Sequence, residues 1–546
     1  MKNKLFILLT LVALTLPTVL PFFNKKFFYT QDYIFIARLN QITTAIFDGN
    51  IPPRWAPDLR FGEPTFNFYA ALPYYFGVII HTLGFNFIWV AKILFILSSI
   101  LSAVTMYILA EKLFGKKGAF LSTLLYVYAP YRAVDMYVRG ALSEAWAFVF
   151  FPLIFYSALC LSEKVSAKRV VFLAFSLSGL FLTHNVTTLM FLPFFALFVT
   201  YLMIKEKKWV LLFPFLASAV LSLGLASFFL LPASFEKDFI QTKYLIVGYF
   251  NFRAHFVAFS QFFSTFWGYG SSVWGREDGL SFQVGLGNWL ILGLAIVFGI
   301  IKRKDKKYLI LLLFLVGSFI LSIILQHNKS AFIWEAFPLM AFIQFPWRFL
   351  SISIFIIAII GGSLASFLKG RHSFIYFILF IFVILTTISY FKPKEYADDS
   401  FFDKFLHKEV MQQGVDLTKD YLPIWVQTTD GKFLSLPETK SGKIEVINFN
   451  KRAGYAQSQI KVFTNSEIVV PITYFPGWTV LANKKIVDQM IPSERGLIRF
   501  SLPAGSYNLQ FEFRDTPVRI IGNITSLICI LGSLLVLFSK KGFKNV

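Results

Sequence analysis

Residues 348–368 read RFLSISIFIIAIIGGSLASFL, and after the first residue this run contains no charged side chain. A helix of about 20 apolar residues, rising 1.5 Å per residue, crosses the ~30 Å hydrocarbon core of a bilayer. Comparable runs lie near 5–23, 87–110, 143–161, 185–204, 209–231, 281–301, 308–326, 373–391 and 517–538, and shorter ones near 118–129 and 170–183. The sequence therefore predicts a polytopic α-helical membrane protein.

The composition of the chain supports this prediction. Of 546 residues, 56% are hydrophobic and only 15% are charged, and the mean hydropathy is +0.64. A soluble domain carries about a quarter charged residues, so a cytosolic globular protein, a disordered chain and a collagen-like fibre are excluded. The net charge of +22 comes largely from Lys and Arg between apolar runs, which indicates membrane topology rather than nucleic-acid binding. Cys160 and Cys529 both lie in apolar runs, so no disulfide or cysteine metal site is predicted.

The basic clusters set the expected orientation. They are Lys2/Lys4, Lys112/Lys116/Lys117, Lys164/Lys168/Arg169, Lys205/Lys207/Lys208, Lys302 to Lys307, Lys369/Arg371 and Lys540/Lys541/Lys544. Placing all of them on the cytoplasmic side gives about 12 crossings with both termini inside. This requires that the stretch 70–84, which contains Pro73, is re-entrant or interfacial. We expect a cell-membrane protein whose first run is a retained anchor.

The polar segments then face outward. They are 24–69, 130–142, 232–280, 327–347 and 392–516. The last alternates apolar and polar residues, as in Gln459-Ile460-Lys461-Val462, with Gly/Pro turn signals between the runs, so we expect an extracytoplasmic β-sandwich-like domain there. This gives a transmembrane domain over 1–391, the β-rich domain over 392–516, and a transmembrane helix with a cytoplasmic tail over 517–546.

Two outward loops carry carboxylates. Asp32 precedes an amphipathic stretch, 33–47, expected on the membrane surface. An Asp in this position is either a helix N-cap or a base held at the membrane–water boundary, and the two roles are compatible. In the second loop, Arg132, Asp135 and Arg139 would share one helical face, with Glu144 following. They form either a self-neutralising ion pair or a grip for a phosphate and sugar.

Other polar groups occur at membrane depth. His184-Asn185 joins two apolar runs, and Gln344-Phe345-Pro346-Trp347-Arg348 opens another. Each has a purely structural alternative: a hydrogen-bonded helix end for His184, a snorkelling anchor for Arg348 and an interfacial aromatic for Trp347. The sequence has no Gly-rich phosphate loop and no His-Glu-x-x-His motif, and its six histidines are scattered, so no metal cluster is evident.

These motifs together resemble a known family. The run from Asp32 through Pro53-Arg54-Trp55, Gly62-x-Pro64, Phe66-Asn67-Phe68-Tyr69 and Pro73-Tyr74-Tyr75 looks like the bacterial and archaeal membrane proteins called "6-pyruvoyl-tetrahydropterin synthase-related". So do Ala129-Pro130-Tyr131, Arg139-Gly140-Ala141, Glu144, His184-Asn185 and Gln344 to Arg348. The resemblance covers roughly residues 1–390. Tyr474-Phe475-Pro476-Gly477-Trp478 and Leu502-Pro503-Ala504-Gly505 look like the extracytoplasmic tail of glycosyltransferase-like membrane proteins.

The overall plan resembles the GT-C superfamily of integral-membrane glycosyltransferases. That resemblance implies a polyprenyl-phosphate sugar donor, Asp32 as the main catalytic residue and Asp135 as the acid of the second loop. Relatives often have a His one turn after the first Asp, where this chain has Ile36. The family label suggests a zinc enzyme with a histidine cluster, which this sequence does not supply.

The favoured hypothesis is an inverting glycosyltransferase that uses a membrane-lipid donor and an unidentified glycan, lipid or protein acceptor, without nucleic acid. The catalytic residues would be Asp32 and Asp135. Substrate would be bound by Arg38, Arg54, Trp55, Asp58, Glu63, Tyr69, Arg132, Arg139, Glu144, His184, Asn185, Gln344 and Arg348. No cofactor is required by the pattern, and a divalent metal, Mg²⁺ or Mn²⁺, between Asp32 and Asp135 is left open. The alternatives are a lipid-linked glycan flippase or transporter, and a non-catalytic envelope protein whose β-domain binds glycan or protein.

Overall fold

The computed structural model describes residues 2–301, 306–368, 373–398, 400–414 and 421–539. Its longer helices are α1 (Lys2–Val19), α2 (Ile34–Phe47), α4 (Leu72–Thr82), α5 (Phe87–Val127), α7 (Leu142–Glu163), α8 (Ala167–Phe181), α9 (Asn185–Glu206), α10 (Leu212–Leu225), α11 (Ser227–Phe235), α12 (Leu286–Ile301), α13 (Lys306–Gln326), α15 (Leu350–Leu364), α16 (Ser373–Thr387) and α19 (Pro517–Phe538). Short helices are α3 (Thr65–Phe68), α6 (Pro130–Ala133), α14 (Ala331–Ala336), α17 (Ser400–Leu406) and α18 (Lys408–Gly414). The basic positions 302–304, 369, 371, 540, 541 and 544 and the tail 540–546 lie outside the described residues.

The chain is a multi-pass membrane protein. Among the described residues, eight helices are long and apolar enough to cross a membrane, or nine if α10 and α11, bent by 76° at their junction, form one broken span. Every apolar run that the sequence marks as a crossing is helical. The helices α8 and α12 are shorter, with 15 and 16 residues.

The 41 residues of α5 are two helices that meet at a sharp kink and fold back on each other as a hairpin. Gly115 breaks it with a φ of 74°, a left-handed conformation that glycine adopts without strain. The rings of Tyr107 and Phe120 are 5.1 Å apart, whereas 13 residues of straight helix would separate them by roughly 20 Å. The two arms correspond to the two runs near 87–110 and 118–129.

The stretch 70–84 forms α4, an 11-residue helix. At 1.5 Å per residue it is roughly 16 Å long, too short to cross a bilayer alone. The predicted amphipathic stretch 33–47 forms helix α2, against which α4, α5 and α17 pack. Most of its residues, Ile36 and Leu39 among them, are buried in these contacts, and its placement at the membrane surface stays a prediction.

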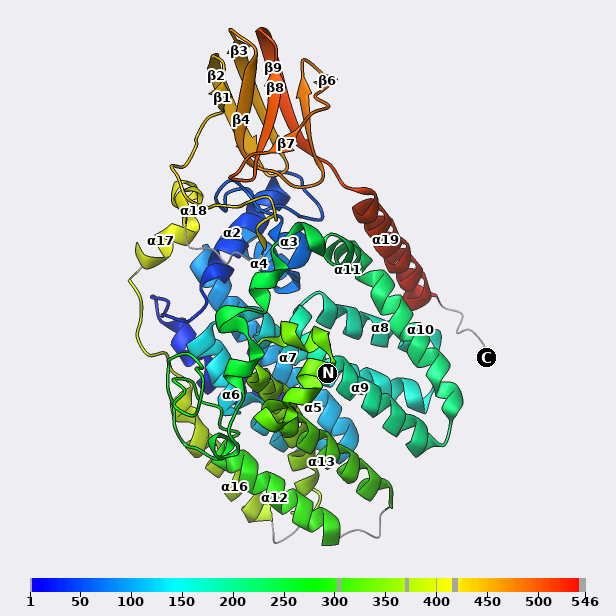
Figure 1. Ribbon diagram of the computed structural model, residues 1–546. Coiled ribbons are helices and arrows are strands. Elements are labelled where there is room, and N and C mark those ends of the chain that lie inside the picture. The colour runs from blue at the N-terminus through cyan, green and yellow to red at the C-terminus, as the bar shows by residue number, and fades with distance from the viewer. Residues whose placement is uncertain (1, 302–305, 369–372, 399, 415–420, 540–546) are drawn as a thin grey trace.

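The C-terminal strands form a two-sheet sandwich, which confirms the β-strand prediction. The strands are β1 (Glu438–Ser441), β2 (Ile444–Arg452), β3 (Tyr455–Val462), β4 (Ser466–Thr473), β5 (Trp478–Ala482), β6 (Lys485–Ile486), β7 (Ile491–Pro492), β8 (Leu497–Leu502) and β9 (Gly505–Phe513). The sheet orders are β1-β4-β8-β7 and β2-β3-β9-β5-β6, all pairs antiparallel. The sandwich stands at one end of the helical bundle (Figure 1). The helices α17 and α18, also within 392–516, lie beside α2 instead of in the sandwich.

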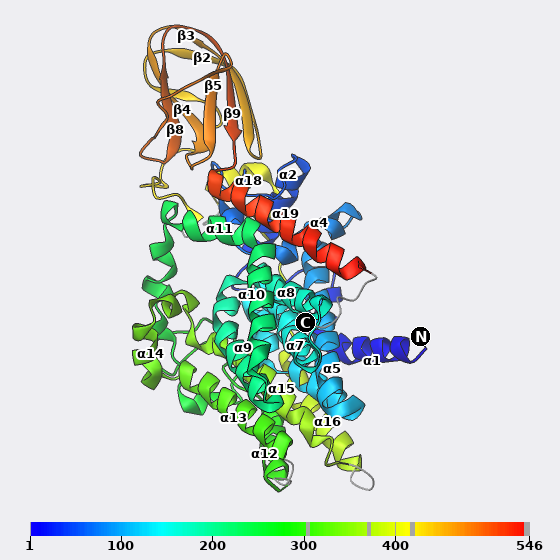
Figure 2. The ribbon, with the colours of Figure 1, turned by 90° about the vertical axis from the view of Figure 1, so that its right-hand side faces the viewer.

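The basic loops gather at one end of the bundle. Lys112, at the turn of α5, forms an ion pair with Glu163 at the end of α7, with 2.7 Å between Nζ and Oε2. These two residues, Lys205 and Tyr308 line one cavity of about 470 Å³. The start of α1 belongs to the first basic cluster of the sequence, and α14 belongs to the predicted outward segment 327–347. Figure 2 shows these two elements on opposite sides of the molecule. Along α7, this basic end lies roughly 29 Å from Glu144, about the thickness of a bilayer core.

Candidate functional site

A cavity of about 930 Å³ opens at the other end of the same helices. Its polar wall comes from seven separate segments: residues 31–38, 69, 139–144, 184–185, 272, 344–348 and 404. The residues that carry this wall are Gln31, Asp32, Arg38, Tyr69, Arg139, Ser143, Glu144, His184, Asn185, Ser272, Gln344, Trp347, Arg348 and Lys404. We call this hollow the cavity. It brings together nine of the residues predicted to form the site.

The first two outward loops are joined by backbone hydrogen bonds. The Gln31 N–H donates to the Val138 carbonyl and the Asp32 N–H to the Arg139 carbonyl, each at 2.9 Å. Gly140 permits this approach, because its φ is +69° and a Cβ there would lie 2.5 Å from the Asp32 carbonyl oxygen. The packing of two backbones at a glycine therefore places Asp32 beside Arg139.

Asp32 lies two residues before α2 and presents its carboxylate to the cavity. Its Oδ1 accepts the N–H of Ile34, the first residue of α2, at 2.9 Å, whereas the N-cap position predicted for Asp32 is taken by Tyr33. Solvent reaches the side chain through the cavity, yet the surrounding protein desolvates it. Burial raises the pKa of Asp32, opposed by Arg38, the Ile34 N–H and Arg139. A carboxyl group with a raised pKa accepts a proton more readily than an ordinary Asp.

Arg139 is neutralised within the protein. Residues Val134–Arg139 form a π-helical turn, in which the Arg139 Nη1 donates to Asp135 Oδ1 and, at 2.8 Å, to Glu144 Oε2. The Tyr131 hydroxyl donates to Glu144 Oε1 at 2.7 Å. Asp135 does not line the cavity; it lies behind Arg139, and burial followed by the charge of Glu144 raises its pKa.

Arg132, Asp135 and Arg139 do not share one helical face as predicted, because the π-helical turn Val134–Arg139 has more residues per turn than an α-helix. Arg132 points to another part of the bundle, where its Nη2 donates to Ser102 Oγ at 3.0 Å and its guanidinium lies 4.3 Å from the Phe148 ring centroid. Arg132 therefore does not line the cavity.

Arg348 has spare hydrogen-bonding capacity. Its Nη1 donates to the Ile343 carbonyl at 2.8 Å and to Gln344 Oε1 at 3.0 Å. Its Nε is buried without a hydrogen-bond partner, with Glu144 Oε2 3.8 Å away. Trp347 beside it lies under the Arg139 guanidinium, 4.6 Å from centroid to Cζ. The motif 344–348 thus supplies a cation aimed at the cavity and an aromatic platform.

Several other groups that line the cavity are neutral and polar. Burial lowers the pKa of His184 to about 3, assisted by Arg348 and Arg139 and opposed by Glu144, so its imidazole is uncharged at neutral pH. The His184 Nδ1 pairs with Thr187 Oγ1 at 2.6 Å, and Asn185 Nδ2 donates to the Phe68 carbonyl at 3.0 Å. The Tyr69 hydroxyl contacts Ser143 Oγ at 3.0 Å. Neutral hydroxyl, amide and imidazole groups are suited to sugar hydroxyls.

The second half of the first loop holds the β-domain and α19 in place instead of lining the cavity. Arg54 donates to the Phe228 carbonyl at 2.6 Å and to Asn523 Oδ1 at 2.8 Å. Nearby, Arg519, 0% exposed, donates from Nε and Nη2 to Glu236 Oε2 at 3.0 and 2.9 Å. We call this group of Arg54, Asn523, Glu236 and Arg519 the clasp.

The other predicted residues of that half are also structural. Trp55 packs in the core of the β-domain, with its ring centroid 5.5 Å from that of Trp478. Asp58 accepts a hydrogen bond from Gln412 Nε2 at 2.7 Å, and Glu63 accepts one from the Thr65 hydroxyl. None of the three lines the cavity.

Asp32 and Asp135 do not form the metal site that the sequence leaves open between them. Asp135 does not line the cavity, and its Oδ1 is paired with Arg139, so the two carboxylates do not face one ion. Among the described residues, no group of three or more His, Cys, Asp or Glu is arranged to hold an ion.

Some cavity residues carry no signal in the sequence. Lys404 on α17 lines the cavity from a segment predicted to be β, and Ser272 comes from a loop without any motif. Trp347 and Tyr131 lie in motifs that the sequence does mark, next to Arg348 and Arg132, and their contacts with Arg139 and Glu144 are visible only in three dimensions.

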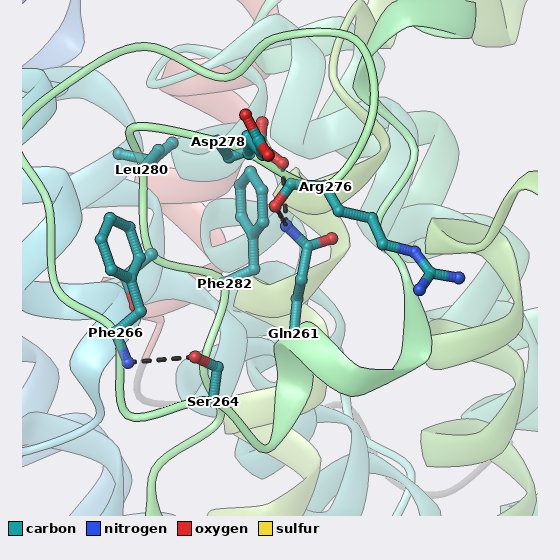
Figure 3. Close-up of a pocket in the computed structure, with 9 residues that line it drawn as sticks. Gln261, Ser264, Phe266, Arg276, Asp278, Leu280 and Phe282 are labelled. Carbon is teal, nitrogen blue, oxygen red and sulfur yellow. Dashed lines mark hydrogen bonds between the residues drawn. The ribbon is translucent and has the colours of Figure 1, made fainter.

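A second, smaller hollow of about 190 Å³ adjoins the cavity at Leu280. Figure 3 shows that its carboxylate, Asp278, faces Gln261, whose Nε2 donates to Asp278 Oδ2 at 2.8 Å. The Asp278 Oδ1 accepts the Val273 N–H at 2.8 Å, and the guanidinium of Arg276 points away from the group (Figure 3). The Asp278 carboxylate is thus bonded within the loop, and the larger cavity, which gathers nine of the predicted site residues, is the candidate site.

Comparisons with known proteins give partial matches. No protein-family model matches the chain. An uncharacterised protein of Lactococcus lactis subsp. cremoris strain MG1363 is 28% identical over 236 residues, covering 41% of this chain and 38% of that relative's length.

Two solved structures match the chain in part. One is ArnT from Cupriavidus metallidurans bound to undecaprenyl phosphate, with a TM-score of 0.41 and 12% identity over 70% of this chain and 64% of that one. The other is the Archaeoglobus fulgidus oligosaccharyltransferase tethered to an acceptor peptide, with a TM-score of 0.44 and 12% identity over 73% and 56%.

Proposed function

We propose that the chain is a GT-C-type membrane glycosyltransferase that moves a sugar from a polyprenyl-phosphate donor to an acceptor outside the cytoplasm. One observation carries the proposal. The carboxylate Asp32, whose pKa is raised, shares a single cavity with the arginines Arg348 and Arg139 at one end of the helical bundle. A base and an anion site in one cavity are the two elements that sugar transfer from a lipid phosphate needs.

The phosphate site is assigned chiefly to Arg348. Its guanidinium has donors left over after its bonds to Ile343 and Gln344, and it lies where α15 begins, at the boundary of a membrane span. A guanidinium binds two phosphate oxygens at once, and it stabilises the charge that develops on the leaving group. Arg139, already paired with Asp135 and Glu144, fixes the position of Glu144 and adds a partial positive field.

The reaction proceeds by displacement at the anomeric carbon. The acceptor hydroxyl gives its proton to Asp32 as its oxygen bonds to that carbon, and the bond between the carbon and the phosphate oxygen breaks. Polyprenyl phosphate leaves as the anion held by Arg348, and attack from the face opposite the phosphate inverts the anomeric configuration. The neutral groups of His184, Asn185 and Tyr69 would hold the sugar. No step uses a metal.

We place the cavity outside the cell and both termini in the cytoplasm. The support is that Lys112 and Lys205 line a hollow at the far end of the bundle, as the positive-inside rule requires of a cytoplasmic face. A membrane-impermeant thiol reagent added to intact cells should label a Ser441→Cys variant in the β-domain and leave Ser539→Cys unlabelled. The opposite pattern would invert the topology.

The decisive test is a transfer assay in membranes with a radiolabelled polyprenyl-phosphate sugar, wild type against Asp32→Asn. Asn keeps the size of the side chain and its capping hydrogen bond to Ile34 but cannot accept the proton. We expect transfer to fall roughly a hundredfold or more with unchanged protein in the membrane. Wild-type turnover in this variant would leave Asp32 as a helix cap only.

The flippase alternative has less support. Transporters place ionisable groups near the bilayer midplane, whereas Glu144 and Arg348 lie at the ends of α7 and of the span that includes α15.

A further inference from the structure

Arg38 is the buried cation of the cavity wall that the reaction above does not use. It lies on α2, lines the cavity and is 5% exposed. Its nearest aromatic contact is Tyr69, whose ring centroid lies 4.0 Å from the guanidinium Cζ. Its Nε is buried without a hydrogen-bond partner, and in the described part of the chain no carboxylate oxygen lies within the 4.0 Å of an ion pair.

A guanidinium in this state is costly. It has five N–H donors, and burying a charge without acceptors or a counter-ion destabilises the folded protein. Arg54, in the same loop, shows the usual solution, since a backbone carbonyl and an amide oxygen accept its hydrogen bonds. Arg38 has neither among the described residues, and it lines the cavity, so a molecule bound there can supply its acceptors.

Arg38 and Arg348 belong to different walls. Arg38 is grouped with Tyr69 on the α2 side, whereas Arg348 is grouped with Glu144 and Gln344 at the start of α7 and α15. Asp32 links the two walls, because its side chain accepts the N–H of Ile34 at the start of α2 and its backbone N–H donates to the Arg139 carbonyl. An anion at Arg38 is thus bound by the helix that follows the base directly in the chain.

We propose that Arg38 forms a second anion subsite, which binds a phosphate group of the acceptor next to the hydroxyl that receives the sugar. The subsite follows from Arg38 itself; its assignment to the acceptor rests on the proposed glycosyltransferase function. Arg348 holds the donor phosphate, and Arg38 holds the acceptor on the helix that presents Asp32. The acceptor is then a phosphorylated glycan, polyol or lipid rather than a neutral sugar or a peptide hydroxyl.

The subsite is tested by binding alone. The full-length protein, purified in detergent and freed of lipid, is titrated with inorganic phosphate by phosphorus NMR. The wild type should bind two phosphates, and Arg38→Gln and Arg348→Gln one each, with the affinity of the lost site reduced at least roughly tenfold. Arg38→Lys, which keeps the charge but not the planar fork, should fall between them.

Arg253→Gln is the matched control, because Arg253 is exposed and paired with Glu335 at 2.8 Å; it should bind two phosphates. Each variant must also unfold at a temperature close to that of the wild type. If Arg38→Gln still binds two phosphates, or if the wild type binds one that only Arg348→Gln removes, the second subsite does not exist.

The acceptor assignment is tested with octylglycerol and its phosphate ester, two acceptors that differ in one phosphate. Transfer to the phosphate ester should exceed transfer to octylglycerol at least tenfold, and Arg38→Gln should remove that preference by slowing only the ester. Equal transfer to both by the wild type would overturn the assignment. The assignment would also be overturned if Arg38→Gln changed the preference between polyprenyl-monophosphate and polyprenyl-diphosphate sugar donors and left the preference between the two acceptors unchanged. Two phosphates bound with no transfer of any kind would count against the glycosyltransferase function and leave the subsite standing.

Discussion

The cavity and the clasp both contain buried arginines, but the arginines differ in where their acceptors come from. In the clasp, Arg519 donates to Glu236 and to the Pro476 carbonyl, so the protein itself satisfies it. In the cavity, no protein hydrogen-bond acceptor is found for Arg38 among the described residues, and Arg348 donates only from Nη1. An unpartnered Nε alone does not separate the two regions, because Arg54 of the clasp also has one; the difference is that both Nη atoms of Arg54 are bonded to the protein. A buried guanidinium with protein acceptors holds segments together, whereas one without them is prepared for a ligand.

The same contrast divides the first outward loop. Its first part, with Asp32 and Arg38, lines the cavity, and its second part, with Arg54 and Trp55, is fastened to α19 and the β-domain. Both parts have charged and aromatic residues at similar spacing, so residue type alone does not separate a binding residue from a structural one. The following three predictions test this division, beginning with the largest effect.

Lowering the pH should stop sugar transfer, because it protonates Asp32 in the first part of the loop. Because burial raises the pKa of Asp32, its carboxylate is protonated at a higher pH than an ordinary Asp, whose pKa is about 3.9. Only the deprotonated form accepts a proton, so the rate should be constant above the raised pKa and fall roughly tenfold per pH unit below it. The measurement is a pH–rate profile in membranes.

His184 provides the control for that profile. Its pKa is lowered to about 3, so it stays neutral over the range in which Asp32 titrates. His184→Gln should therefore change the rate without moving the acid limb. An acid limb near pH 6.5 that disappears in His184→Gln would assign the base to His184 instead.

In the clasp, Arg54→Gln should destabilise the fold without a specific effect on transfer. It removes charge-assisted hydrogen bonds to the Phe228 carbonyl and Asn523, which contribute roughly 1.5–3 kcal/mol each. We expect a loss of roughly 2–5 kcal/mol, measured by thermal unfolding in detergent. Arg38→Gln, in the same assay, should be neutral or stabilising because it removes a cation that has no acceptors. Equal losses in both variants would remove the distinction between the two regions.

The sequence predicts the helices and strands better than it predicts the division of the first loop. Uninterrupted apolar runs give the membrane helices, and alternation such as 459–462 gives β3, because both patterns depend on residues close in the chain. The roles of Arg54 and Arg38 depend on residues far away. Arg54 is bonded within the fold because Asn523 and the Phe228 carbonyl lie beside it. The residues around Arg54 in the sequence do not predict these distant partners. The helix α17, which covers α2 and brings Lys404 to the cavity, lies in a segment whose composition suggests strands.

The smallest expected effect concerns Arg348. Lys at this position keeps the positive charge and loses the planar fork that binds two phosphate oxygens. We expect Arg348→Lys to raise the KM for the polyprenyl-phosphate sugar roughly tenfold, since one charge-assisted hydrogen bond contributes about 1.5 kcal/mol. Its effect on unfolding should be smaller, because Lys keeps the charge that faces Glu144 and can donate to the Ile343 carbonyl or to Gln344 Oε1 in place of Arg348. Arg253→Lys, at an exposed ion pair with Glu335, is the matched control and should leave KM unchanged. A residue that serves only to anchor the helix at the membrane surface can be Lys or Arg alike. An unchanged KM in Arg348→Lys would therefore place Arg348 with the structural arginines of the clasp and move the donor phosphate elsewhere in the cavity.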